Sequence, residues 1–351
     1  MGLSRLQISH VRNLTDVTLS DLPRLNQFVG ANGSGKTSLI EAVYLLGRAK
    51  TLRSNQIRPV IQRGEQSLTV FGINETGSAL GVERSTATTR IRIDQQDVRS
   101  RSELVSRLPL LLITPESHRL FELGPKLRRQ FLDWAMFHVE PAFHGVWQTY
   151  QKALKQRNAL LRSLAGDTQL QPWEDLMVES GEALSELRDV VVRQLDPMMG
   201  RVTAELLELD PPELRYLPGW DQKQSLGEAL LQGRDRDRAR GYTGVGPHRA
   251  DLAIQLADQP ARDVVSRGQQ KLLIAALCLA QAGLFAKKRG QRSMLLVDDL
   301  AAELDAERRK AFFSVLTRYP GQVFITGTVA MTDIDPEWKL FHVEHGDIAA
   351  I

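Results

Sequence analysis

A glycine-rich stretch near the start of the chain constrains the fold more than any other feature. Residues 30–37 match the pattern G-x-x-x-x-G-K-[ST]. An apolar run at 25–30 precedes the stretch, and apolar residues at helical spacing follow it over 37–46. Strand, glycine loop and helix in this order predict backbone N–H groups that surround a phosphate at the positive end of a helix dipole. The eight residues are Gly30, Ala31, Asn32, Gly33, Ser34, Gly35, Lys36 and Thr37.

The side chains of this loop are suited to a nucleoside triphosphate and its magnesium ion. Lys36 is expected to reach the β- and γ-phosphates, and Thr37 to bind Mg²⁺ through its hydroxyl. An apolar run at 294–297 ends in Asp298 and Asp299. We predict that Asp298 binds the metal and that Asp299 polarises the attacking water. Alone, such an acid pair could equally be a cap or a turn, but together with the loop it predicts ATP and Mg²⁺ as cofactors.

A third motif precedes a long apolar helix predicted over 268–285. Residues 266–271 read Ser-Arg-Gly-Gln-Gln-Lys, and Ser266 is typical of a helix N-cap. The motif also resembles the signature sequence of ATP-binding-cassette (ABC) ATPases, with Arg267 where transporters usually have glycine. In that superfamily this helix start faces the γ-phosphate held by a second subunit. The resemblance therefore groups Ser266 with Lys36 and Asp299 as catalytic residues.

Composition and charge exclude several classes of protein. The 351 residues are 42% apolar and 25% charged, as in ordinary globular chains, and the net charge is only +3. Of the 45 basic side chains, 34 are arginine, which favours contacts to phosphate or carboxylate. The lone cysteine, Cys278, excludes an internal disulfide and is expected to be inert. The apolar stretch at 272–286 is too short to span a bilayer, so we expect a cytoplasmic protein without a membrane segment.

The distance between the two halves of the nucleotide site predicts the domain organisation. Lys36 and Asp298 are 262 positions apart. Much of the intervening chain has helical spacing, over 131–139, 147–164, 173–199 and 202–209, and it lacks sustained heptads. The predicted fold is α/β: an ABC-type P-loop ATPase head with an inserted, mainly α-helical arm (lobe II) and no long coiled coil. We assign 1–113 and 246–351 to the head and 114–245 to the arm.

Further motifs along nearly the whole chain resemble the RecF family of bacterial recombination mediators, which are ABC-type ATPases similar to chromosome-maintenance proteins. They are Val11-Arg12-Asn13, Thr114-Pro115-Glu116, Gly124-Pro125 with Arg128-Arg129-Gln130-Phe131-Leu132-Asp133, Gly246-Pro247-His248-Arg249-Ala250-Asp251-Leu252 and Phe324-Ile325-Thr326-Gly327-Thr328. Three departures stand out. Ala302 lies where the D-loop, the segment that follows the acidic strand in this superfamily, usually has a serine. Ala250 replaces a common acid. Thr326 and Thr328 occupy the region of the transporters' switch histidine, so no γ-phosphate sensor is assigned.

The resemblance implies a DNA-repair function. Proteins similar to RecF dimerise when ATP is bound, hydrolyse it slowly, bind single-strand/double-strand junctions at gaps in duplex DNA, and help load the recombinase RecA together with RecO and RecR. Arg12 is a candidate to flank the adenine, and for His248 and Arg249 a structural role is favoured. Candidate contacts to DNA phosphates, each of which could equally belong to a solvated charged face, are Arg48, Lys50, Arg53, Arg58, Arg128 and Arg129.

Two other classes remain open. One is the ATP-driving subunit of an ABC transporter, against which the long insertion and the missing switch histidine argue. The other is a P-loop kinase, which has no need for a signature motif such as the one at Ser266. DNA binding measured with and without ATP distinguishes a transporter subunit from a RecF-like protein. Phosphate release without an acceptor distinguishes a kinase from a RecF-like protein.

Overall fold

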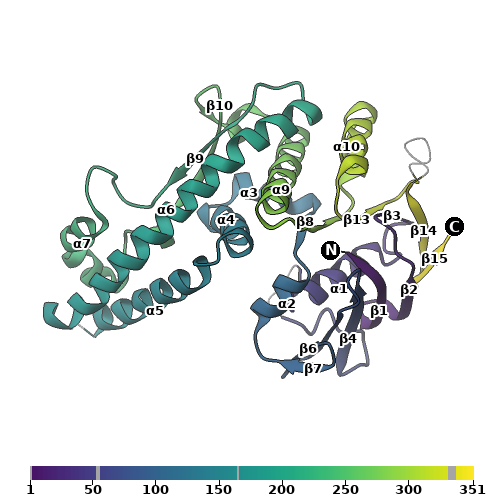
Figure 1. Ribbon diagram of the computed structural model, residues 1–351, viewed down its shortest axis with the longest axis horizontal. Coiled ribbons are helices and arrows are strands. Elements are labelled where there is room, and N and C mark those ends of the chain that lie inside the picture. Colours follow the sequence, from purple (N-terminus) through teal and green to yellow (C-terminus); the bar gives the residue numbers. More distant parts are fainter. Residues whose placement is uncertain (1, 53–55, 164–165, 331–336) are drawn as a thin grey trace.

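The computed structural model describes residues 2–52, 56–163, 166–330 and 337–351, with every side chain in them except that of Ala302. Figure 1 shows a head, which carries both ends of the chain, and an arm that extends away from it. The head contains a six-stranded sheet in the order β15-β14-β3-β13-β12-β8, parallel except for β15. Its strands are β3 (Leu25–Val29), β8 (Leu110–Ile113), β12 (Met294–Val297), β13 (Val323–Gly327), β14 (Lys339–Glu344) and β15 (Asp347–Ala350).

Strand β12 is apolar throughout and fully buried because both faces of the sheet are covered there. In β12, Leu295 and Val297 pack into a core shared with the arm, whereas Met294 and Leu296 pack into a second core beside α1. Successive side chains of a strand point to opposite faces. A strand buried on both faces therefore reads as a continuous apolar run, which is why 294–297 was recognisable as a strand from the sequence.

The second core lies beneath an antiparallel sheet in the order β2-β1-β4-β5-β6-β7. Helix α1 (Lys36–Arg48) contacts this sheet through β4 and β5 and contacts β13 of the parallel sheet. The head thus has two sheets with α1 between them. The remaining elements here are β1 (Leu3–Val11), β2 (Leu14–Ser20), β4 (Ser67–Asn74), β5 (Ala79–Ser85), β6 (Thr89–Ile93), β7 (Gln96–Val98) and α2 (Arg101–Arg107).

The arm is built on one long helix, α6 (Asp167–Leu206), packed along α5 (Phe143–Arg162). The sequence predicted separate helical stretches at 173–199 and 202–209, but α6 runs for 40 residues with Pro172 and Pro197 inside it. The elements between β8 and α9 that accompany these two helices are η1 (Pro115–His118), α3 (Arg119–Glu122), α4 (Pro125–Val139), β9 (Glu213–Leu217), α7 (Leu226–Arg240), η2 (Pro247–Arg249), β10 (Asp251–Leu256), β11 (Gln259–Pro260) and α8 (Ala261–Val264).

Two local features of the arm differ from what the sequence predicts. The alternating charges at 234–238 predict a solvated helix end or loop, and they do lie in the last turns of α7, but Arg234 is 8% exposed and Asp237 is fully buried. The strand β9 was not predicted, and it pairs with β10 and β11 in a small third sheet. Because β9 falls before residue 246 and β10 after it, this sheet joins segments assigned to different lobes, and the proposed domain boundaries stay a prediction.

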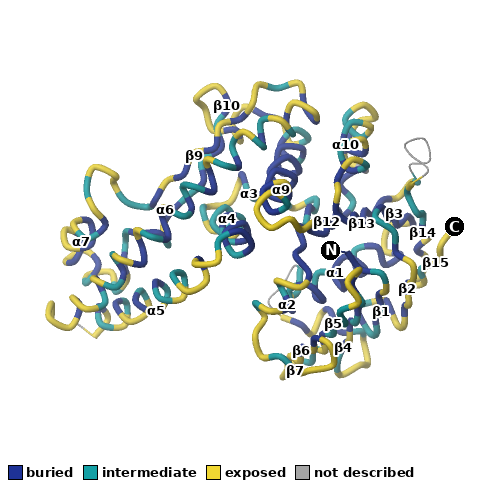
Figure 2. The backbone as a smooth tube through the Cα atoms, viewed as in Figure 1, coloured by how far each residue is buried: buried dark blue, intermediate teal, exposed yellow. Residues whose placement is uncertain are grey.

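Helix α9 (Arg267–Arg289) links the arm to the head. It contacts α4 and α6 of the arm and β8 of the head, and Figure 2 shows it buried along most of its length. By length and hydropathy α9 is long and apolar enough to cross a membrane, contrary to the expectation for 272–286, but 78% of its apolar window is buried inside the protein. Cys278 lies in this core, where burial raises the pKa of its thiol to about 12. The chain continues through η3 (Leu300–Glu303) and α10 (Ala306–Arg318).

Candidate nucleotide-binding site

The glycine loop joins the end of β3 to the start of α1, as the sequence predicted. The Gly30 amide donates to the carbonyl of Gly327 at 3.2 Å, and a Cβ at Gly30 would lie 2.1 Å from the Val343 carbonyl oxygen. Gly33 and Gly35 have φ of 81° and 125°, a region that side chains disfavour. The three glycines therefore allow the backbone to wrap tightly before α1 begins at Lys36.

Lys36 lies folded against the loop. Its Nζ donates to the carbonyls of Gly30 at 2.8 Å and Ala31 at 2.9 Å, and the residue is 5% exposed. Within the described part of the chain Lys36 forms no ion pair, so its charge is balanced only by neutral carbonyl oxygens. A buried cation without an acid is strongly stabilised by an incoming anion.

The end of β12 meets the start of α1, although 261 residues separate them. The Thr37 hydroxyl donates to the Asp298 carboxylate, with oxygen–oxygen distances of 3.1 and 3.2 Å. Asp298 is 1% exposed and also accepts from the Thr326 hydroxyl at 2.9 Å. Asp299 follows with a φ of 50°, and its amide donates to the Thr326 Oγ1 at 2.9 Å. Thr326 thus holds both acids in place from the neighbouring strand β13.

The residues present fit a magnesium-bound triphosphate. The Ser34 hydroxyl and the Asp299 Oδ1 are buried and, among the described residues, have no hydrogen-bond partner, which leaves both available to a ligand. A threonine hydroxyl beside one carboxylate is a donor set typical of Mg²⁺, which takes its remaining ligands from phosphates and water. No cluster of three or more His, Cys, Asp or Glu residues in the described ranges offers a separate all-protein metal site.

Three residues that the sequence analysis did not assign to the site hold the loop from outside. They are Asn13, Ser38 and Gly346, and we call them the bracket. Asn13 donates through Nδ2 to the Ser34 carbonyl at 3.1 Å and accepts from the Ser38 hydroxyl at 2.7 Å. The Gly346 amide donates to the same Ser34 carbonyl at 2.8 Å. The Val11-Arg12-Asn13 motif was a signal for Asn13, but no local pattern marked Gly346, which lies in the turn between β14 and β15.

Arg12, the candidate for flanking adenine, is held by a buried acid. Its Nε donates to Glu41 Oε2 at 2.5 Å, and Glu41 is fully buried and accepts from the Leu52 amide at 3.2 Å. The Arg12 side chain keeps 32% of its surface exposed. A contact between Arg12 and a base stays a prediction.

Ser266 caps α9 and, among the described residues, makes no hydrogen bond with the glycine loop of its own chain. Its Oγ accepts from the Gln269 amide while the Gln269 side chain accepts from the Ser266 amide, and Ser266 is exposed. One turn further along, Lys271 pairs with Glu303, which joins the start of α9 to the segment after Asp299. The side chain of Ala302, the departure noted in the D-loop, lies outside the described part of the structure.

The arginine candidates for DNA contact differ in their surroundings. Arg48 donates to the Leu110 carbonyl, and burial lowers its pKa. Arg128 pairs with Asp251, and Arg129 donates to the Ala250 carbonyl. These three guanidinium groups therefore stabilise the fold. Lys50 and Arg58 are exposed, and Arg53 lies outside the described residues.

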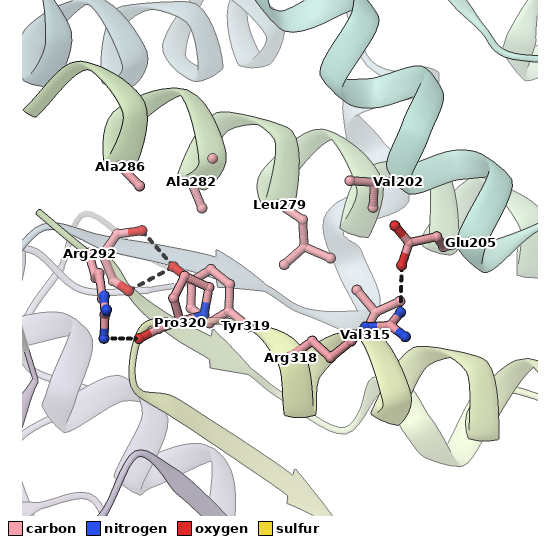
Figure 3. A pocket seen from close by; sticks show the side chains of 12 residues that line it. Val202, Glu205, Leu279, Ala282, Ala286, Arg292, Val315, Arg318, Tyr319 and Pro320 are labelled. Carbon is pink, nitrogen blue, oxygen red and sulfur yellow. Dashed lines mark hydrogen bonds and ion pairs between the residues drawn. The ribbon is translucent and has the colours of Figure 1, made fainter. Parts of the chain in front are cut away.

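A cavity of about 220 Å³ lies elsewhere, between α6, α9 and α10. Figure 3 shows Leu279 and Ala282 of α9 facing it, with the ion pair between Arg318 and Glu205 at one end. The cavity shares no residue with the glycine loop or the acid pair. Its lining joins head and arm helices and offers no phosphate-binding loop.

Known proteins resemble this chain along its whole length. The family model described as the RecF/RecN/SMC N terminal domain matches residues 2–346. Proteins named DNA replication and repair protein RecF from Pseudomonas entomophila (strain L48) and Stutzerimonas stutzeri (strain A1501) are 46% and 44% identical to it, over 99% and 100% of this chain and 98% of each relative.

Solved structures give the same answer for the fold. The structure of the recombination mediator RecF with ATP in the RecFOR pathway superposes with a TM-score of 0.88 at 23% identity, covering 100% of this chain and 97% of the other. An Smc head domain from Pyrococcus furiosus with an extended coiled coil, bound to the C-terminal domain of ScpA, gives 0.57 at 13% identity, covering 100% and 96%.

These similarities confirm the predicted fold class, an ABC-type ATPase head with a helical arm. The described residues contain no long coiled coil. The resemblance predicted from the sequence motifs is confirmed as well, and the transporter alternative is not favoured. With a family model over residues 2–346 and relatives identical at nearly half of the aligned positions, the chain belongs to the RecF family.

Proposed function

We propose that this protein is an ATP-dependent DNA-binding switch of recombinational repair and replication. The observation that carries the proposal is the convergence of Lys36, Thr37 and Asp298 around the glycine loop, while Ser266 is exposed and free of that loop. A site complete for the phosphates and magnesium but lacking the signature serine is suited to a second copy that supplies it.

In this proposal each side chain has one task. Lys36 exchanges its carbonyl partners for phosphate oxygens, and Thr37 and Asp298 hold the metal, which neutralises charge on the phosphates when bound. Asp299 orients the attacking water through its Oδ1, which has no hydrogen-bond partner in the described ranges. Ser266 of a second copy contacts the terminal phosphate, so ATP favours the dimer by mass action and hydrolysis releases it.

Partners are proposed from the relatives. The RecF protein whose ATP-bound structure resembles this chain belongs to the RecFOR pathway, and we extend RecO and RecR, and RecA through them, to this chain as partners. We propose single-strand/double-strand junctions of gapped DNA as the nucleic acid and the cytoplasm as the location. We also keep 1–113 with 246–351 as the head and 114–245 as the inserted arm, with the elements η2 and β10 of the second head segment packed on the arm against α6, β9 and α4.

Sedimentation velocity on the full chain tests the proposal. We expect a monomer without nucleotide and a dimer with ATP and Mg²⁺, with a gapped duplex bound by the dimer. Lys36→Ala should remove the ATP-dependent dimer while circular dichroism shows an intact fold, because Lys36 is the only described side chain that brings a positive charge against the loop carbonyls. A Lys36→Ala variant that dimerises with ATP as well as the unaltered protein does would contradict the shared-phosphate model.

A further inference from the structure

The segment after α7, residues 241–250, is fixed by buried polar contacts from the arm helices. Thr243 is 1% exposed, and both its amide and its hydroxyl donate to Asn158 Oδ1, at 2.8 and 2.7 Å. Its hydroxyl also accepts from the buried Arg157 at 2.8 Å, and the next amide, of Gly244, donates to Asp237 at 2.9 Å. The start of this segment is therefore tied to both α5 and α7.

The second half of the segment is held as firmly. His248 contacts the Tyr150 hydroxyl through Nδ1 at 2.7 Å and the Thr243 carbonyl through Nε2 at 3.0 Å. Burial lowers the pKa of His248 to about 4, so the ring is neutral at physiological pH. Arg188 of α6 donates to the Pro247 carbonyl at 2.8 Å. These contacts confirm the structural role predicted for His248, and they leave the segment little freedom to move.

Two side chains of this fixed segment face solvent and stack on each other. Tyr242 is 41% exposed, and the guanidinium carbon of Arg249 lies 5.2 Å from the centre of its ring. Arg162 and Arg240 are exposed nearby, and Arg162 packs on Gly241 and donates to its carbonyl. Within the described residues none of the three arginines, Arg162, Arg240 and Arg249, forms an ion pair with an acid. Buried hydrogen bonds therefore fix the backbone that carries the exposed Tyr242 ring, which lies near three arginines without an acidic partner among the described residues.

We propose that Tyr242 and Arg249, with Arg162 and Arg240 beside them, form a contact site for an unpaired nucleotide of DNA. We call these four residues the arm platform. Tyr242 stacks on the exposed base, and the arginines bind the phosphates on either side of it. The proposal rests on the proposed function, because it says where on the arm the gapped strand is held.

The chemistry of the arm platform favours nucleic acid over an acidic peptide. Carboxylates need only cations, whereas a ring already stacked against a guanidinium offers a flat face, and every base has a matching π-face. An unpaired base can leave its neighbours and stack on a protein side chain, whereas a base within a duplex must first be unpaired and unstacked, which costs a few kcal/mol. Because the buried contacts of residues 243–248 fix the arm platform before DNA binds, the platform loses little conformational freedom on binding.

Fluorescence anisotropy with the full chain, ATP and Mg²⁺ tests the proposal on a gapped duplex and on a continuous duplex of equal length. Tyr242→Ala should weaken binding to the gapped duplex about 5- to 160-fold, the range measured for lost base stacking, and leave the continuous duplex nearly unchanged. Tyr242→Phe keeps the ring and should bind as the unaltered protein does. Leu231→Ala, which trims a 58% exposed side chain on α7, is the matched control.

A fluorescent base separates stacking from simple charge attraction. With 2-aminopurine in the gap, we expect quenching on binding that Tyr242→Ala abolishes. Arg249→Ala should weaken binding and lower the salt slope by about one phosphate contact, while Arg63→Ala, which removes an exposed guanidinium from the head, should not.

Three results would overturn the arm platform. They are gapped-DNA affinity unchanged in Tyr242→Ala, an equal loss in Leu231→Ala, or competition by a glutamate-only peptide as strong as that by a single strand of the same charge. The last would assign the surface to an acidic protein partner. Tyr242→Ala should keep ATP-dependent dimerisation. If the unaltered protein dimerises with ATP but binds no DNA, the proposed function fails, and the arm platform fails with it.

Discussion

At the scale of single residues, Asp299 has the most specific role to test. Its Oδ1 is buried without a partner among the described residues, while its backbone amide is anchored to Thr326. Asp299→Asn keeps the shape but removes the negative charge that polarises water, so hydrolysis should fall by at least about 100-fold, as for loss of a general base. ATP binding and the dimer should persist.

Phosphate release and sedimentation on the same sample check this prediction. Glu307→Gln, which alters an exposed acid on α10 that forms no ion pair among the described residues, is the comparison for a change of charge alone. Turnover of Asp299→Asn equal to that of the unaltered protein would remove Asp299 from the reaction.

Gly346 allows a second prediction at this scale. Gly346 has a φ of 93°, and a Cβ there would lie 2.2 Å from the Asn13 carbonyl oxygen. Gly346→Ala should therefore displace Asn13 and distort the loop, weakening ATP binding about tenfold, which corresponds to about 1.4 kcal/mol.

Gly77→Ala is the matched control for Gly346→Ala. Gly77 has a similar φ of 83°, but no atom lies within 4 Å of the added Cβ. Both variants lose about 1 kcal/mol of stability to backbone strain, and only Gly346→Ala should change nucleotide affinity in calorimetric titration. Equal affinities in the two variants would show that the bracket does not shape the loop.

At the scale of elements, a buried ion network joins α5, α6 and α7. Arg157 is fully buried and donates to Glu174 at 2.9 Å and to Asp237 at 2.8 Å. Arg157→Met leaves Asp237 buried and uncompensated, so the free energy of unfolding should fall by about 3–5 kcal/mol. The exposed pair of Arg193 and Asp189 is the control. Arg193→Met should lower the free energy of unfolding by at most about 1 kcal/mol.

Urea denaturation and hydrogen exchange measure this difference. Faster exchange should concentrate in α5 and α7, and ATP binding should survive, because α1 and the loop belong to the other hydrophobic core. If Arg157→Met and Arg193→Met unfold at the same urea concentration, the buried network contributes no more than a surface pair.

At the scale of the whole molecule, the buried His138 and the partly buried His248 lower the stability of the fold in acid. Burial lowers the pKa of His138 to about 3 and that of His248 to about 4, against 6.5 when unfolded. Above pH 6.5 both are neutral in either state and their contribution is complete. As the pH falls below 6.5 the unfolded chain gains protons that the folded chain cannot, so stability drops by up to about 1.4 kcal/mol per pH unit for each histidine.

The urea midpoint measured from pH 7 down to pH 4.5 checks this dependence. His138→Leu should reduce the fall of the urea midpoint with decreasing pH. The His138 ring packs among Trp134, Phe137 and Phe285 without a partner for its Nε2 in the described structure. His144→Ala, at an exposed position, should leave the slope as it was. A slope unaffected by His138→Leu would contradict the assignment.

The head was predictable from the sequence because its signals are local. The glycine loop, the apolar strand before Asp298 and the N-cap at Ser266 each lie within a few consecutive residues. The contact between Gly346 and Ser34 joins segments 312 residues apart, and no pattern around either residue indicates it. Arg234 and Asp237 were misread for a related reason: their burial depends on partners in α5 and α6, so hydropathy alone placed them in solvent.

The link between Gly346 and the glycine loop also has a consequence for how the protein matures. A ribosome makes Ser34 of the loop 312 positions before Gly346, the residue that braces it. During synthesis the nucleotide pocket is therefore unfinished until the closing hairpin emerges and docks. A nascent chain that ends before Gly346 would lack this brace, so tight nucleotide binding, and any pairing that depends on it, requires translation to pass this residue.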